Sequence, residues 1–436
     1  MDELFSVDSL PNGIEVHVMC APKFKTNSIT AVLHSDLAAE TAAWNAVLSQ
    51  VARRGTARYP RTSDFMQSLD RLYGASLGAG VSKRGERQLI VFGLEVANGK
   101  YLPAGEDLMP EAMVTLRELI FDPALEGGVL RSDYVEQEKE NLRRLIESIL
   151  DEKQAYAFKR CVEEMCRGER YAIPKLGKVE DIAAITPERL FVQHQQVISE
   201  SPMDIFVVGD VDRAEVLDLM ARVFDMNRDP KPVRFARESA KPGAGADERA
   251  RDPRRIVEAM DVSQGHLVMG YRIGSTYSDS DFPAMVFANG VFGAYTHSKL
   301  FQNVRERASL AYFADSSLDQ TMGYLWVNAG IDFDALDRAV EIVGEQLSDM
   351  QSGVINEKEM ENTRRGILRD IQMMRDSSSA MVDFAIMGDV NGVSITPAQL
   401  SQAIEAIALQ DVVSAAQTIR LDTTYFLRDE GGESHD

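Results

Sequence analysis

The chain has 436 residues, 44% of them hydrophobic and 26% charged, and carries a formal net charge of −21 at pH 7. A chain this long exceeds one ordinary hydrophobic core, so we expect two domains of roughly 200 residues each. The acidic balance argues against nucleic acid and anionic membranes as partners, since both require a basic face, but it permits cationic peptide or protein partners.

The first half of the chain predicts alternating strands and amphipathic helices. Polar and apolar residues that alternate indicate strands, and apolar residues three or four positions apart indicate helices. Asn12-Gly13 is typical of a turn, and the first two strands are expected to be joined by a short turn as well. The expected strands cover residues 14–18, 28–34, 76–82, 87–96 and 203–209, and the expected helices cover 41–52, 63–73, 109–120, 132–166 and a stretch capped by Thr186.

Residues 227–254 break this pattern. They contain several prolines and glycines, few large apolar residues and many Arg and Lys residues in an otherwise acidic chain. This composition is typical of a solvated linker. Alternatively, its cations could pair with an acidic face of a domain. The linker separates an N-terminal domain, residues 1–226, from a C-terminal domain, residues 255–436.

The second half repeats the plan. Strands are expected at 255–261, 266–271 and 324–331, a polar turn at 316–322, helices at 282–292 and from Ala335 and Asn356, and a disordered tail at 429–436. The stretch Glu138–Ile146 reappears as Glu359–Ile367, with six of nine residues identical. We therefore predict an α+β fold with two homologous domains, each a mainly antiparallel sheet covered by helices, joined by the linker.

The segment 301–313 contains two residues that could bind a substrate. Arg305 is expected at the end of a helix, and Tyr312 is expected where the chain enters a strand. Arg offers a permanent planar cation and Tyr a neutral phenol donor, and such a pair could stabilise a carbonyl oxygen as it becomes an oxyanion. The alternative is a solvated Arg and an amphipathic Tyr at the edge of a sheet.

No other residue set supports catalysis by this chain. The six histidines are scattered singly, without the spacing of a zinc site, and no nucleotide-binding loop or nucleophile elbow is present. Three cysteines cannot form a disulfide framework, and Cys161 and Cys166 lack zinc-knuckle spacing. No segment has the ~18 apolar residues of a membrane span, and the acidic N-terminus differs from a signal peptide. A cytoplasmic location is expected.

The stretch Ala43–Thr56, followed by Tyr59-Pro60, resembles the zinc helix of the pitrilysin and mitochondrial-processing-peptidase family, which reads H-x-x-E-H and ends in Gly-Thr. Aligned on Gly55-Thr56, the two histidine positions fall on Ala46 and Gln50, and the glutamate position falls on Ser49. The resemblance implies a third ligand in the later helix, within 138–147, but we assign none there because both histidines are missing. The helix is kept while its metal chemistry is lost.

The second half of the chain keeps the signature residues of this family, whereas the first half has lost its zinc-binding residues. Ser298-Lys299-Leu300-Phe301, Arg305 and Leu310-Ala311-Tyr312 match the family signature S-x-L-F…R-E-x-x-x-L-A-Y. In that family the Arg and the Tyr bind the substrate carbonyl over a zinc ion held by the other domain or the other subunit. Bacterial members of the small-subunit branch are often encoded in pairs, and this chain looks like the member without the zinc motif.

The resemblance implies a non-catalytic subunit of a heterodimeric zinc peptidase. A homologous partner would supply zinc, its ligands and the glutamate base, while this chain would bind no metal and would supply Arg305 and Tyr312 for hydrolysis of unfolded peptides. The alternative is a structural or peptide-binding pseudopeptidase. An independently active zinc peptidase is the least favoured of the three. The isolated chain could also form a homodimer.

Overall fold

The computed structural model describes residues 5–103, 105–233 and 252–430. The expected linker lies mostly outside these residues, as does most of the expected C-terminal tail. The described residues form two compact units. The first holds the described parts of Met1–Glu147, Ile173–Phe235 and Ser377–Ile386, and the second holds those of Ser148–Ala172, Ala236–Asp376 and Met387–Asp436.

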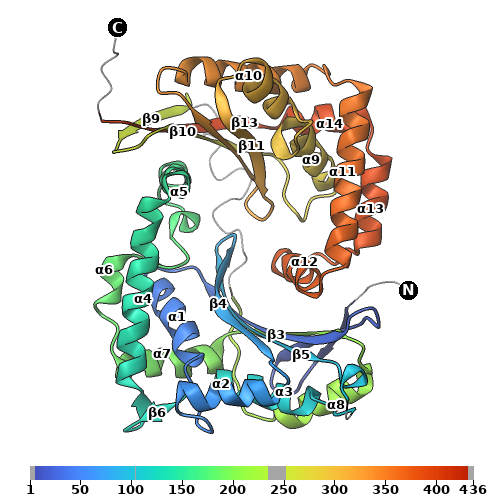
Figure 1. Ribbon diagram of the computed structural model, residues 1–436. Helices are drawn as coiled ribbons and strands as arrows, with labels where there is room; N and C mark the ends of the chain where they lie inside the picture. The colour runs from blue at the N-terminus through green and yellow to red at the C-terminus, as the bar shows by residue number, and fades with distance from the viewer. Residues whose placement is uncertain (1–4, 104, 234–251, 431–436) are drawn as a thin grey trace. The chain divides into compact units, whose positions relative to one another are not determined.

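The first unit contains a six-stranded sheet with the order β1-β2-β8-β3-β5-β4 (Figure 1). Its strands are β1 (Ser6–Ser9), β2 (Ile14–Cys20), β3 (Thr26–Asp36), β4 (Ser76–Arg84), β5 (Arg87–Ala97) and β8 (Met203–Gly209). The strand β8 lies between β2 and β3, parallel to β2 and antiparallel to β3. The strands β2 and β3, which the sequence predicted to be joined by a turn, are therefore not direct neighbours.

Helices cover one face of this sheet. They are α1 (Ala39–Ala52), α2 (Thr62–Arg71), α3 (Met109–Phe121), α4 (Ser132–Asp151), α6 (Val179–Ile182), α7 (Pro187–Glu200) and α8 (Arg213–Val223), with the short elements η1 (Gly99–Tyr101), β6 (Leu125–Glu126) and β7 (Val129–Leu130) between them. The alternating residues Ile29, Ala31 and Leu33 of β3 are fully buried in this core. Thr186 caps α7 by accepting a hydrogen bond from the Arg189 amide at 3.3 Å, and Pro187 occupies the first turn.

The sheet of the second unit has the order β11-β12-β10-β13-β9. Its strands are β9 (Arg254–Ala259), β10 (Gly265–Arg272), β11 (Ala311–Asp319), β12 (Tyr324–Ile331) and β13 (Arg420–Arg428). The last strand, β13, again lies between the first two, parallel to β9 and antiparallel to β10. The sequence echo thus extends to sheet topology, which confirms two homologous α+β domains. The turn expected at 316–322 is shorter, because β11 continues to Asp319.

One face of the second sheet is covered by helices from its own half of the chain. They are α9 (Phe282–Asn289), η4 (Gly290–Ala294), η5 (Phe301–Arg307), α10 (Leu336–Gln351), α11 (Glu357–Arg375), α13 (Pro397–Ala406) and α14 (Leu409–Ala416). Both η4 and η5 are π-helical. The helix expected at 282–292 therefore changes its winding after Asn289.

The other face of the second sheet is covered by α5 (Lys153–Met165), a helix from the first half of the chain. The prediction of one continuous helix over 132–166 is wrong, because Glu152 leaves the helical region with φ −83° and ψ 82°. In exchange, the segment Ser377–Ile386, which includes the first part of α12 (Ser378–Asn391), belongs to the first unit. The expected domain limits of 226 and 255 do not include this exchange.

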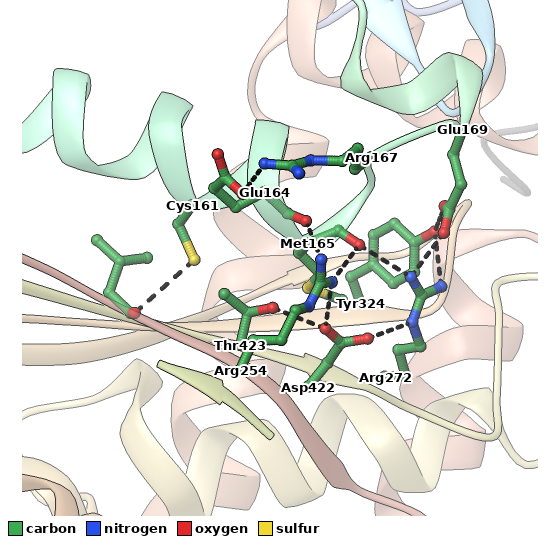
Figure 2. A network of polar contacts seen from close by, with 11 residues as sticks. Cys161, Glu164, Met165, Arg167, Glu169, Arg254, Arg272, Tyr324, Asp422 and Thr423 are labelled. Carbon is green, nitrogen blue, oxygen red and sulfur yellow. Dashed lines mark hydrogen bonds and ion pairs between the residues drawn. The ribbon is translucent and has the colours of Figure 1, made fainter. Parts of the chain in front are cut away.

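A polar network holds the end of α5 and the short helix η2 (Arg170–Ala172) against the sheet (Figure 2). The Arg272 guanidinium bonds to Asp422 at 2.8 Å and to Glu169 at 2.6 Å. Arg254 donates to the Met165 carbonyl and to Asp422, both at 2.9 Å. These charge-assisted bonds fix the segment where the buried apolar face of α5 meets the strands.

No helix among the described residues combines the length and the apolar composition that a membrane crossing requires.

Candidate functional site

Arg305 lies in the second unit, on the π-helical turn η5. Its guanidinium carbon stands 4.6 Å from the centroid of the Phe301 ring, and its closest acid, Glu306, is 3.8 Å away. The Arg305 side chain remains 42% exposed. A π-helix is rare and is frequently found at functional sites. Arg305 rests on the Phe301 ring while most of its donors stay unused by the described residues.

Tyr312 lies on β11, the edge strand of the second sheet. The pairing of β11 with β12 shifts register between Ala311 and Phe313, so Tyr312 sits at a β-bulge. Bulges commonly redirect a side chain, and they recur beside active sites. Just before the strand, Ser309 has a φ of +53°, a left-handed conformation that costs free energy for a residue other than glycine. The Tyr312 side chain is 67% exposed, and within the described residues its hydroxyl has no hydrogen-bond partner.

The two predicted donors thus lie on irregular backbone and face solvent. A guanidinium and a phenol that are not satisfied by their own chain can both donate to an incoming carbonyl oxygen. What Arg305 and Tyr312 can do chemically is bind and stabilise negative charge on oxygen.

The helix α1 carries the three degenerate positions in the first unit. Ala46 is 3% exposed and Ser49 is fully buried. The Ser49 hydroxyl donates to the Ala46 carbonyl at 2.8 Å, so it is used inside its own helix. Gln50 donates its amide to the Ala79 carbonyl of β4 at 2.9 Å. A methyl group, a hydroxyl and an engaged amide do not fit zinc, which takes imidazole, thiolate or carboxylate ligands.

A cation that follows this helix pairs with a buried acid of α4. Arg54 pairs with Glu138 of α4, and Asn141 donates to the other oxygen of the same carboxylate at 3.0 Å. Glu138 is 6% exposed, so its charge depends on these partners. The later helix in which the resemblance places the third ligand therefore uses its buried acid in an ion pair.

Sequence reasoning missed a buried polar cluster in the first sheet. The Nε2 atoms of His17 and His34 stand 2.8 Å and 2.7 Å from the two oxygens of Asp204. Burial alone would raise the pKa of the Asp204 carboxyl, but the bonds from both histidines outweigh burial and lower the pKa to about 2. In the sequence these residues are three separate polar side chains on expected strands. They come together only because β2, β8 and β3 are neighbours in the sheet, and the sequence does not show this strand order.

Glu15, His17 and Asp204 each have one side-chain atom that could bind a metal ion, and these atoms lie within 4.8 Å of one another. The short separation between His17 and Asp204 is that of a hydrogen bond, and it leaves their polar atoms engaged with each other. We therefore interpret this cluster as structural.

Comparisons with known proteins agree on one family. Residues 184–367 match the family described as Peptidase M16 inactive domain. A Bacillus subtilis (strain 168) protein, "Probable inactive metalloprotease YmfF", is 35% identical over 434 residues, which is 100% of both chains. A mitochondrial-processing peptidase subunit beta from Lentinula edodes is 22% identical over 446 residues, covering 97% of this chain and 88% of the other.

Solved structures share the same fold. A conserved protein from Enterococcus faecalis V583 superposes with a TM-score of 0.88 at 28% identity, covering 99% of this chain and 100% of the other. Because the Bacillus subtilis relative is 35% identical over the whole chain, the similarity is one of sequence as well as of fold. The chain belongs to the M16 family of peptidases, the family to which the pitrilysin-type and mitochondrial-processing-type enzymes belong.

Proposed function

We propose that this chain is the non-catalytic subunit of a two-chain zinc peptidase that hydrolyses unfolded peptides. A homologous partner supplies zinc, the zinc ligands and the carboxylate that activates water. This chain supplies Arg305 and Tyr312 to the carbonyl oxygen of the scissile bond. Without the partner the chain binds no zinc and cleaves nothing.

One contrast between two sets of residues carries this proposal. In the first unit, Ser49 and Gln50 are engaged by the chain's own carbonyls, so neither of these two side chains is left to bind a metal or polarise water. In the second unit, Arg305 and Tyr312 remain solvent-exposed on a π-helix and a bulge. Irregular backbone that presents two exposed donors is costly to keep for stability alone, and it is typical of a binding site.

The test mixes the purified chain with a zinc-bearing homologue from the same genome and measures turnover of an unstructured peptide. Arg305→Ala and Tyr312→Phe should each lower kcat by about 100-fold, because one oxyanion donor typically contributes that much. Arg307→Ala is the matched control, since Arg307 lies on the same helix, faces solvent and bonds only to Asn303 at 2.9 Å within the described residues.

Turnover within about twofold of wild type for both variants would show that Arg305 and Tyr312 are not used. Metal analysis of each separated chain gives a second check, with zinc expected in the partner alone. Stoichiometric zinc in this chain, together with peptidase activity that a chelator removes, would instead favour an independent peptidase.

A structural or peptide-binding pseudopeptidase is the second candidate. It is favoured by the edge strands β4 and β11, each of which has one side free of strand partners within the described sheets. An extended peptide can add to such an edge through main-chain hydrogen bonds. Micromolar binding of an unstructured peptide by the chain alone, with no gain of hydrolysis on adding the zinc-bearing homologue, would select this candidate.

The location we propose is the cytoplasm. Cys20, Cys161 and Cys166 are all free thiols, and two of them are buried in the core under α5. Free thiols suit a reducing compartment. Fractionation of cells that produce the chain at its natural level tests this location.

A further inference from the structure

The segment that leads into the Arg305 helix is attached to one face of α11. Alternate residues of the segment each contact a residue on that face: Tyr295 Oη donates to Asp370 at 2.7 Å, His297 Nε2 lies 3.0 Å from Thr363 Oγ1, and Lys299 Nζ lies 3.1 Å from Glu359 Oε1. The helix positions 359, 363 and 370 are four and seven residues apart, so they share one face of α11. Every second residue of 295–299 is therefore anchored.

Two glycines show how closely the segment fits. A Cβ atom on Gly366 of α11 would lie 3.1 Å from the Tyr295 ring. A Cβ atom on Gly290 would lie 3.2 Å from the same ring. The Tyr295 ring also stacks on the His297 ring at 5.2 Å with an interplanar angle of 8°. This contact is closely packed as well as polar.

The ion pair at the end of the segment is buried. The Lys299 side chain is 7% exposed and the Glu359 side chain is 17% exposed. The second oxygen of Glu359 accepts the Asn356 amide at 2.8 Å, which closes the capping box at the start of α11. The carboxylate is thus fixed at both oxygens. Removing one partner of such a pair leaves an unpaired charge that the rest of the structure must move to satisfy.

Lys299 is also the first residue of the helical stretch that continues into η5. The position of its backbone therefore determines the position of the turn that carries Arg305. Asn303 donates to the Lys299 carbonyl at 3.0 Å and to Gln346 of α10 at 2.6 Å. Val304, next to Arg305, is fully buried. The backbone of Arg305 is therefore held between the α11 contact on one side and the core on the other.

We propose that Lys299 is a positioning residue for Arg305, acting through its buried ion pair with Glu359. This inference rests on the proposed function for the use of Arg305 in catalysis. The positioning itself is a property of the isolated chain. A displacement of about 1 Å at a group that binds a transition state can lower turnover about 100-fold, so loss of the pair should be visible in kcat.

The first experiment needs no partner. Hydrogen exchange of the backbone amides of 301–308 is compared between the wild-type chain and Lys299→Met, whose side chain has nearly the same length without the charge. Exchange in this segment should rise at least tenfold, while exchange in β10 and β13 stays unchanged. Lys358→Met is the matched control. Lys358 is exposed on α11, next to Glu359 in the sequence, so its replacement should leave the exchange rates unchanged.

The second experiment uses the two-chain complex and a double-mutant cycle. Lys299→Met should lower kcat at least tenfold with KM within twofold, and Lys299→Arg should restore most of the loss. In an Arg305→Ala background, Lys299→Met should cause no further loss, because a residue that acts through Arg305 has nothing left to position. Glu359→Gln should reproduce the result if Lys299→Met does not fold.

Each outcome has a distinct meaning. If Arg305→Ala lowers turnover while Lys299→Met leaves both turnover and exchange unchanged, the positioning inference is wrong and the proposed function stands. Equal losses from Lys299→Met in both backgrounds also contradict the inference, because the effect would then bypass Arg305. If Arg305→Ala has no effect, the proposed function fails and the catalytic part of the inference fails with it, whereas the exchange result still decides whether the ion pair holds 301–308.

Discussion

Glu138 and Glu359 occupy the same position in the two copies of a repeated helix segment, and each forms an ion pair with a cation that lies earlier in the chain within its own unit. Glu138 of α4 pairs with Arg54, which comes just after α1, and Glu359 of α11 pairs with Lys299, which comes just after α9 and η4. The repeated glutamate is thus paired in both units, with an Arg in the first and a Lys in the second.

Removing the cation from the first of these pairs should destabilise the first unit. Arg54→Met leaves the buried Glu138 carboxylate without its main partner. Because the Arg54 side chain is 24% exposed, we expect a loss of about 2 kcal/mol, below the range for fully buried pairs. Urea unfolding followed by circular dichroism measures the change.

The companion variants for this prediction separate charge from packing. Arg54→Met combined with Glu138→Gln should recover most of the loss, since no unpaired charge remains. Arg144→Ala, which removes a pair with Glu140 from the exposed side of the same helix, should cost less than about 0.5 kcal/mol. A cost for Arg54→Met no larger than that of Arg144→Ala would contradict the assignment.

The carboxylate shared by two histidines should contribute a defined pH dependence. The pKa of Asp204 is lowered from 3.8 to about 2, so at pH values between them the unfolded chain binds a proton that the folded chain does not. Asp204 then adds stability above pH 4, worth about 2 kcal/mol, and this contribution is lost as the pH falls towards 2. Chemical unfolding at pH 6, 4 and 3 measures it.

Asp204→Asn should remove this part of the pH dependence and lower stability at pH 6 by about 1–3 kcal/mol, because one amide oxygen cannot accept from both His17 and His34. Other acids also titrate in this range, so the informative quantity is the difference between variants. Asp218→Asn, at an exposed position on α8, should keep the wild-type slope. An unchanged slope in Asp204→Asn would show that the carboxylate is not charged as inferred.

Much of the fold follows from local patterns. The alternating strands, the Thr186-Pro187 cap and the echo between Glu138–Ile146 and Glu359–Ile367 were sufficient to predict two homologous α+β domains. These features depend on neighbouring residues, which a sequence displays directly. The insertion of β8 and β13 between earlier strands could not be predicted, because strand order depends on contacts between distant residues.

The candidate site divides in the same way. Arg305 and Tyr312 could be singled out by their spacing, and so could the lost zinc positions Ala46, Ser49 and Gln50. The backbone conformations around Arg305 and Tyr312 could not be predicted. The π-helix, the bulge and the positive φ of Ser309 result from packing between η5, β11 and the core. The partners of Lys299 and Asp204 likewise come from elements 60 to 187 residues away in the chain.

The network around Arg272 should control how firmly α5 is held. Asp422 bonds to Arg272 and Arg254, and these bonds lower the pKa of its carboxyl although burial would raise it (Figure 2). Asp422→Asn weakens both bonds and should speed proteolytic cleavage within 148–172 several-fold, with a cost of about 1–3 kcal/mol. Limited proteolysis followed by mass spectrometry locates the cleavage.

The matched variant for this network is Arg167→Ala, because Arg167 pairs with Glu164 on the exposed side of α5 and its side chain is 72% exposed. Cleavage in 148–172 should stay at the wild-type rate in that variant. Equal rates for Asp422→Asn and Arg167→Ala would mean that the apolar contacts alone hold α5.

The three cysteines should differ in reactivity. Cys20 is exposed, whereas Cys161 and Cys166 are buried. Burial raises the pKa of the Cys161 thiol well above its ordinary value, so almost no thiolate forms at neutral pH. A thiol reagent at pH 8 should modify one cysteine quickly in the folded chain and all three in urea. Fast modification of two or more in the native chain would contradict the burial of α5.

The exchange of helices between the two halves has a consequence for synthesis. The helix α5 leaves the ribosome about 90 residues before β9, the first strand that it contacts. At ~5–20 residues per second, its apolar side waits ~5–20 seconds for a partner. The strand β13 is made after the other strands of its sheet and is inserted between two of them, so the sheet stays incomplete until β13 has been made. A gene cut at the domain border would separate α5 from the sheet that it covers and residues 377–386 from the first unit.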